Sequence, residues 1–301
     1  MTYSAGNTIL DDDYNGFKDT VNATNATGSG TQGYGQPVVA AVSAGATVTA
    51  TQWVTLLTPI SEMASHQGTS ITSITNPVLG DTIAAYSALS ANITAVTGDN
   101  RFNAAASGND GSVSSVTTAT WTTSAVLTKT FTFASANQLR YFFNAGGMLR
   151  FSWSRTGGTS NSQNTAWSNL FNACGVIALT GDANSKSIAS VSYTGTTKIG
   201  GSGSPSVLRT DLGLQNFTTN TLLFRQAAAG AGYTTNNISF EAAISGAVVT
   251  ITTRLADGSG GFTDSVDGTL TQVSTIREPS NTHLDITWGT TTQNSPSWVT
   301  S

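Results

Sequence analysis

Hydrophobic residues in the first hundred positions recur every three to four residues, which is the spacing of amphipathic helices. The first stripe consists of Ile9, Leu10, Tyr14, Phe17 and Val21. Three aspartates, Asp11–Asp13, lie at its start, where carboxylates favour the positive end of a helix dipole. The pattern therefore predicts a first helix that begins near Asp11 and ends before Gly28.

Two further stripes predict two more helices. The second contains Trp53, Leu56, Leu57, Ile60 and Met63. We expect Thr49 to cap this helix, Gly68 to end it, and Pro59 to shorten or kink it. The third helix is predicted from Asp81, as N-cap, to Gly98, with its buried face formed by Ile83, Tyr86, Leu89, Ile93 and Val96.

From about residue 112 the hydrophobic period changes to two, which is typical of strands. A hairpin is predicted where Leu139–Phe143 and Met148–Ser154 flank Asn144–Gly147. One helix, from Asn164 to Ala173, interrupts the strands. The other predicted strands are Val126–Phe133, Ser187–Tyr193, Thr221–Arg225, Asn237–Ile244, Val248–Leu255, Gly268–Ile276 and His283–Trp288.

The two periods predict an α+β protein in which N-terminal amphipathic helices precede an antiparallel β-sandwich-like region with one inserted helix. We expect a helical region over residues 1–110 and a β-rich domain over residues 111–301. The Gly-, Ser- and Thr-rich segments Arg155–Ser162 and Thr194–Pro205 are predicted to be loops at a tip or at contacts between subunits.

Charge is scarce in this chain: 9% of its residues are charged, whereas an ordinary globular domain has about 25%. Its polarity comes from Thr, Ser, Asn and Gly, which can hydrogen-bond across a contact between identical chains without charge repulsion. The 12 Lys and Arg residues are scattered, which disfavours nucleic acid as a partner. The sequence also contains no apolar stretch of membrane-spanning length and no visible signal peptide at Met1–Gly6.

The residues that carry enzyme chemistry are few. Cys174 lies in an apolar run and is expected to be buried, and His66 and His283 are too few for a zinc site. No nucleophile, metal or phosphate-binding motif occurs. The acids that could form a glycosidase pair are scattered along the chain, at Glu62, Glu241, Asp257, Asp264 and Asp267. We therefore expect no enzyme activity and no catalytic, cofactor-binding or metal-binding residue.

Two weaker signals concern ligands. Asp257–Asp264 loosely resembles a calcium-binding turn but lacks the ligand spacing of an EF-hand, which favours a hairpin loop. Among candidate sugar-stacking residues, Trp153, Trp167 and Trp288 fit apolar periodicities and are expected in the core. Trp298 lies in a Ser-, Pro- and Thr-rich tail and is expected at a surface or a subunit contact.

Several segments, in order along residues 11–170, resemble a family of virion structural proteins of tailed phages, particularly cyanobacterial contractile-tailed phages. They are Asp13–Asn15, Gly33–Gln36, Thr49–Leu57, His66–Gly68, Tyr141–Ser152 and Asn164–Leu170. The last 130 residues are similar to the family only in style. The resemblance implies a tail, baseplate or fibre component of the virion. Our hypothesis is that the helical region, residues 1–110, docks such a component to the particle.

These observations together predict a non-enzymatic tail-fibre or baseplate protein that forms a homo-oligomer, with a trimer as its expected form. Its expected partners are copies of itself and other virion proteins. The alternatives are a neck, collar or capsid-decoration protein, a glycan-binding module that attaches to the host surface, and an enzyme that cleaves host polysaccharide.

Overall fold

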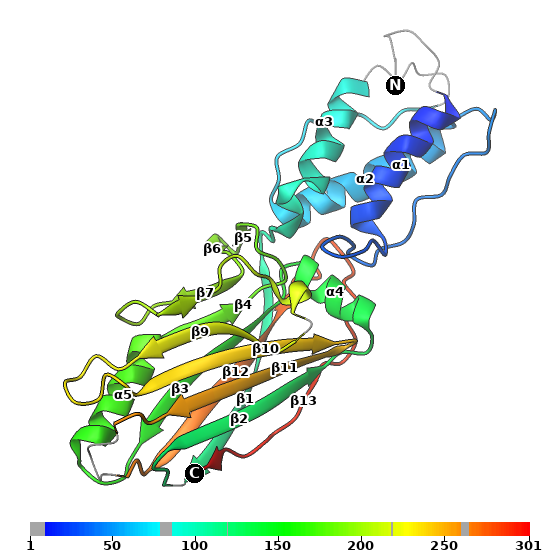
Figure 1. The fold of residues 1–301 in the computed structure, drawn as a ribbon. Coiled ribbons are helices and arrows are strands. Elements are labelled where there is room, and N and C mark those ends of the chain that lie inside the picture. The colour runs from blue at the N-terminus through cyan, green and yellow to red at the C-terminus, as the bar shows by residue number, and fades with distance from the viewer. Residues whose placement is uncertain (1–9, 79–85, 119, 218, 260–264) are drawn as a thin grey trace.

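The computed structural model of the chain has a helical region at one end and a β-sandwich at the other (Figure 1). It describes residues 10–78, 86–118, 120–217, 219–259 and 265–301. The strands pair antiparallel throughout the two large sheets. The fold class is therefore α+β, as the hydrophobic pattern predicts.

The described helical region consists of α1 (Asp11–Asn25), α2 (Ala50–Gln67), α3 (Tyr86–Thr97) and the 3-10 helix η1 (Asp99–Phe102). The ends of α2 are as predicted: Thr49 and Gln52 form a capping box, and Gly68 follows in the left-handed conformation. The helix continues past Pro59 to Gln67, so Pro59 does not shorten it. The predicted start of the third helix at Asp81 lies outside the described residues.

Two sheets form the sandwich. The five-stranded sheet has the order β1 (Ser107–Thr118), β12 (Thr269–Pro279), β3 (Met148–Thr156), β4 (Val176–Leu179) and β7 (Thr196–Ile199). The other has the order β13 (Thr292–Gln293), β2 (Ser124–Thr132), β11 (Val248–Ala256), β10 (Asn237–Ser245), β9 (Thr221–Ala227) and β8 (Val207–Leu208), and β14 (Val299–Thr300) also pairs with β2.

Aromatic side chains join the inner faces of the two sheets. Phe151 of the five-stranded sheet lies between Phe131 and Phe240 of the other, with ring centroids 5.8 and 4.7 Å apart. A polar contact also crosses the core, because Gln272 Oε1 accepts hydrogen bonds from Trp153 Nε1 and Thr253 Oγ1 at 2.8 and 2.7 Å. The predicted inserted helix is α5 (Ser162–Cys174), which packs Trp167 and Cys174 into this core.

The predicted hairpin around Asn144–Gly147 is wrong. Its first half is a helix, α4 (Ala136–Asn144), and only its second half is a strand, β3. Ser135 Oγ accepts a hydrogen bond from the Gln138 backbone and starts the helix, whose apolar side chains Leu139, Phe142 and Phe143 then all reach the core. Phe142 and Phe143 follow Leu139 by three and four residues. In a helix the three side chains lie on one face, whereas in a strand they would point to both faces.

Two further strand predictions are corrected. Ser187–Tyr193 is not one strand but two, β5 (Lys186–Ile188) and β6 (Val191–Tyr193), joined by a turn in which Ala189 and Ser190 have positive φ. His283–Trp288 forms no strand. Its alternation is genuine, because Leu284 and Ile286 are buried, but its backbone bonds to side chains instead of to a neighbouring strand. The remaining short element is the 3-10 helix η2 (Leu214–Asn216).

The helical region and the sandwich meet at a hydrogen-bonded junction. Asn144 Nδ2 donates to Gly33 O at 3.1 Å, and His66 Nε2 bonds to Ala145 O at 3.0 Å. Gly35 lies against the Tyr141 ring, where a Cβ would come within 2.5 Å of a ring carbon. The junction therefore brings together three of the segments that carry the family resemblance, Gly33–Gln36, His66–Gly68 and Tyr141–Ser152.

Candidate functional site

The helix α5 lies at the end of the sandwich far from the helical region (Figure 1). A groove follows one side of this helix. It consists of two adjoining hollows of about 450 and 520 Å³, which share Ala166, Asn169 and Gly230. The two loops predicted as tips both contribute to it, through Ser160–Ser162 and Ser202–Ser204. We call this feature the α5 groove.

The α5 groove is lined by neutral residues. No charged residue is among the described residues that line it. Its polar side chains are the carboxamides of Asn161, Asn169 and Gln226, the phenol of Tyr233 and the hydroxyls of nearby Ser and Thr residues. Carboxamides and hydroxyls both donate and accept hydrogen bonds. The groove therefore suits an uncharged ligand rich in hydroxyl or amide groups.

Gln226 is the buried polar residue of the groove, with 3% of its surface exposed. Its Nε2 donates to Ser202 O at 3.0 Å, which ties the strand β9 to the 202–204 loop. Its Oε1 has no hydrogen-bond partner among the described residues. A buried carbonyl oxygen without a partner costs free energy, so Gln226 Oε1 is an unsatisfied acceptor in the wall of the groove.

A network around Asp267 fixes the other loop of the groove. The Asp267 carboxylate accepts hydrogen bonds from Thr159 N and Oγ1 at 3.0 and 2.8 Å, and from Asn164 Nδ2 at 2.5 Å. Arg155 Nη2 also lies 3.4 Å from it. These hydrogen bonds, those of Thr159 first, hold the pKa of Asp267 below its usual value. Asp267 therefore holds the loop before α5 in place.

The 202–204 loop, on the other side of the groove, is also fixed by hydrogen bonds. Lys198 Nζ donates to the carbonyls of Ser202 and Gly203, each at 2.9 Å. Gly201 has a φ of +69°, and a Cβ there would lie 2.2 Å from Ala173 O. Only glycine fits this approach of the loop to the end of α5. Both walls of the groove are therefore ordered by contacts within the chain.

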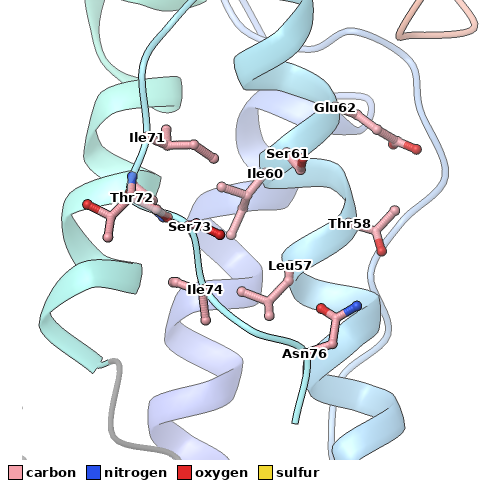
Figure 2. A pocket seen from close by; sticks show the side chains of 11 residues that line it. Leu57, Thr58, Ile60, Ser61, Glu62, Ile71, Thr72, Ser73, Ile74 and Asn76 are labelled. Carbon is pink, nitrogen blue, oxygen red and sulfur yellow. The ribbon is translucent and has the colours of Figure 1, made fainter.

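A second pocket, of about 470 Å³, lies in the helical region between α2 and residues 71–76. Leu57 and Ile60 of α2 face Ile71 and Ile74 across it, whereas Glu62 extends away from them (Figure 2). Asn92 of α3 fixes the segment at residues 71–76, because its side chain accepts from Thr72 N at 2.9 Å and donates to Thr72 O at 2.8 Å. Glu62 is the one titratable residue among the described residues that line the pocket.

Among the other residues considered as catalytic groups, Asp264 lies outside the described residues. Cys174 is buried, and burial raises the pKa of its thiol to about 12. Burial also lowers the pKa of His66 to about 4. Glu241 lies 3.7 Å from Arg254 on the neighbouring strand. Within the described ranges, no three His, Cys, Asp or Glu residues gather in a way that could hold a metal ion.

The tryptophans lie almost as predicted, with one exception. Trp153 and Trp167 belong to the sandwich core, and Trp288 is partly buried against it. Trp298 was expected at a surface or a subunit contact, but it is 6% exposed and packs into the sandwich core. The C-terminal tail runs along β2, and its pairing with that strand brings Trp298 inward. Part of Asp257–Asp264 lies outside the described residues; Asp257 itself bonds Ser259 and Gln163.

Comparisons of the chain with protein-family models, with curated proteins and with solved structures found no match. The resemblance to phage virion proteins is thus carried by the sequence segments alone. In the described part of the chain, no helix combines the length and the apolar character needed to cross a membrane.

Proposed function

We propose that this chain is a non-enzymatic structural protein of a tailed-phage particle, a tail-fibre or baseplate component that assembles as a homo-oligomer. The observation that carries the proposal is the division of the molecule into a helical region and a charge-poor sandwich whose loops gather at the far end (Figure 1). Neutral polar surfaces suit contacts between identical chains, and a trimer is the form we expect.

In this proposal the helical region docks to the particle and the sandwich extends away from it. An apolar groove of about 350 Å³ on the helical region supports that orientation. Val38 and Val54 line the groove, and Val38 is 68% exposed. A neck, collar or capsid-decoration protein is the alternative position on the same particle.

Antibody labelling of purified particles tests the proposal directly. We expect label on the tail or baseplate, and a homo-oligomer in sedimentation of the purified protein. Label on the neck or head would move the protein to the alternative position. A stable monomer at micromolar concentration, together with no label on any particle, would contradict the proposal.

A second candidate function is glycan binding at the host surface, and the α5 groove favours it. The groove is uncharged, ordered on both sides and equipped with carboxamides, one of which has an unpartnered buried oxygen. Carboxamides can bridge neighbouring hydroxyls of a neutral sugar because each offers a donor and an acceptor. Its position far from the helical region would present the groove to a host cell.

A glycan array with three variants tests this second function. Asn169→Ala and Gln226→Leu should each weaken binding of a neutral glycan about tenfold, the effect of losing roughly 1.4 kcal/mol. Asn172→Ala is the matched control, because Asn172 is exposed on the same helix but does not line the groove. Absence of signal on the array, or equal weakening by all three variants, would remove glycan binding.

A further inference from the structure

The outer edge of β1 is the longest open strand edge in the described structure. β1 ends the five-stranded sheet and pairs with β12 from Ser107 to Thr118. No strand among the described residues pairs with its other side. Backbone N–H and C=O groups along the outer side of an edge strand can pair with another chain.

The other edges in the described part are short or covered. β7 has four residues, including Lys198, and β8 has two. These two edges also lie together, because Thr196 N donates to Arg209 O at 3.1 Å. The outer side of β2 is covered by β13 and β14 from the C-terminal tail. Asn294 adds two hydrogen bonds to Thr130 there, through its backbone N and its side-chain oxygen.

β1 lacks the features that protect strand edges. Its segment Gly111–Thr118 contains no charged residue and no proline, the residues that usually prevent an edge strand from pairing with another chain. The one acid nearby, Asp110, lies 3.7 Å from Arg150 and 3.8 Å from Arg277, so its charge is balanced within the chain. The register irregularity of β1 lies between Ser107 and Asp110, which leaves Gly111–Thr118 regular.

The side chains of β1 on the outer face of the sheet are exposed as well. On the outer face of the sheet, Ser112, Ser114, Val116 and Thr118 are exposed. Val116, with 52% of its surface exposed, is among the large apolar residues left in solvent. A long, neutral and regular edge of this kind would pair unspecifically unless a defined partner covers it.

We infer that β1 pairs antiparallel with β1 of a second copy, so that two five-stranded sheets join into one. The inference rests on the homo-oligomer of the proposed function and names its contact. A second copy fits because Gly111–Thr118 carries no charge that would repel its own copy, and its Val and Thr residues favour strands. The contact is isologous, so it joins copies in pairs, as a dimer or as two linked trimers.

The symmetry of this contact restricts which side chains meet. A two-fold axis perpendicular to the sheet keeps the outer faces of both copies on one side, so outer residues oppose outer residues. In the two central registers, Ser114 opposes either Ser114 or Val116 of the second copy. The two Ser114 side chains are then direct or diagonal neighbours, which places their Cβ atoms within about 8 Å of each other.

Charge substitutions at Ser114 test the inference by sedimentation velocity. Ser114→Lys and Ser114→Glu should each halve the mass of the wild-type assembly, because like charges then face each other across the contact. An equimolar mixture of these two variants should recover the wild-type mass. Ser154→Lys is the matched control, since Ser154 is exposed on the outer face of β3, an inner strand of the same sheet.

The outcomes separate this contact from the wider proposal. A wild-type oligomer whose mass is unchanged by both Ser114 variants would overturn β1 pairing and leave the oligomer standing. A wild-type monomer at all concentrations would overturn both. Hydrogen exchange of the wild-type protein gives a second measurement that needs no variant. Exchange of the β1 amides should slow as concentration rises, and exchange independent of concentration would overturn the inference.

Discussion

Two lysines lie inside the protein, and their surroundings differ. Lys186 Nζ donates to Asp182 O and Thr180 Oγ1 at 2.5 and 3.1 Å. Lys129 has no exposed surface, and its one hydrogen bond among the described residues is a long one, 3.4 Å, to Val113 O. Burial lowers the pKa of both side chains to about 8. At neutral pH each ammonium group therefore carries a charge inside the protein, but only that of Lys186 has short hydrogen bonds to protein oxygens.

Replacing Lys129 by methionine should stabilise the protein at pH 7 by ~1–3 kcal/mol, because it removes a buried charge and keeps the side-chain volume. Lys186→Met is the contrasting variant and should destabilise by about 1–2 kcal/mol, since it removes two hydrogen bonds from buried oxygens. Urea unfolding of both variants measures these changes.

The pH dependence of the same variants gives a check. The folded protein releases the Lys129 proton near pH 8, whereas an unfolded chain holds it to about 10.5. Wild-type stability should thus rise with pH between these values, and Lys129→Met should lose part of that rise. A Lys129→Met protein less stable than the wild type would show that the buried ammonium is held by contacts stronger than its geometry indicates.

At the scale of elements, the predictions that succeeded rest on strong local signals. The strands β10 and β11 alternate over nine residues each around Gly246, and α2 has a capping box and a terminal glycine. β1 was not predicted as a strand, because Val113 and Val116 point to opposite faces and leave no alternation. The segment at residues 283–288 alternates but is packed by side-chain hydrogen bonds, which local periodicity does not encode.

The candidate site, too, could be predicted from local sequence only in part. The composition of the loops at residues 155–162 and 194–205 predicted a tip, and both line the α5 groove. Gln226 was not identified, and Asp267 was considered only as a candidate acid, because their roles depend on partners 24 and more than 100 residues away. A carboxamide within a strand and an acid in a loop give no local sign of such contacts. Sequence therefore located the loops of the site but not the residues that order it.

At the scale of the whole molecule, the junction links the two regions through residues distant in the chain. Besides the bonds of Asn144 and His66, Gln36 exchanges two hydrogen bonds with Asp285, at 2.8 and 3.1 Å. Leu284 and Ile286, from the C-terminal part, complete the core of the helical region. The helical region is thus not closed by its own helices alone, and we expect both regions to unfold in one transition.

The buried imidazole of His66 makes this junction sensitive to pH. Its pKa is lowered by burial to about 4, whereas an unfolded histidine titrates near 6.5. Between these values the unfolded chain binds a proton that the folded chain does not, so stability falls as pH falls. The full loss is about 3 kcal/mol, of which about 2 kcal/mol should be lost between pH 6.5 and pH 5.

Urea unfolding of the wild type and of His66→Gln at pH 7 and pH 5 tests this expectation. Glutamine can still donate to Ala145 O but does not titrate. The free energy of unfolding of the His66→Gln protein should therefore change between pH 7 and pH 5 by about 2 kcal/mol less than that of the wild type. The charge of His283 makes a smaller contribution to the lowered pKa of His66, so His66→Gln removes this interaction as well. Asp267, whose pKa is lowered from its ordinary value, acts at more acidic pH than this window. Equal pH dependence in the two proteins would mean that His66 is protonated without cost in the fold, and that the junction opens to solvent.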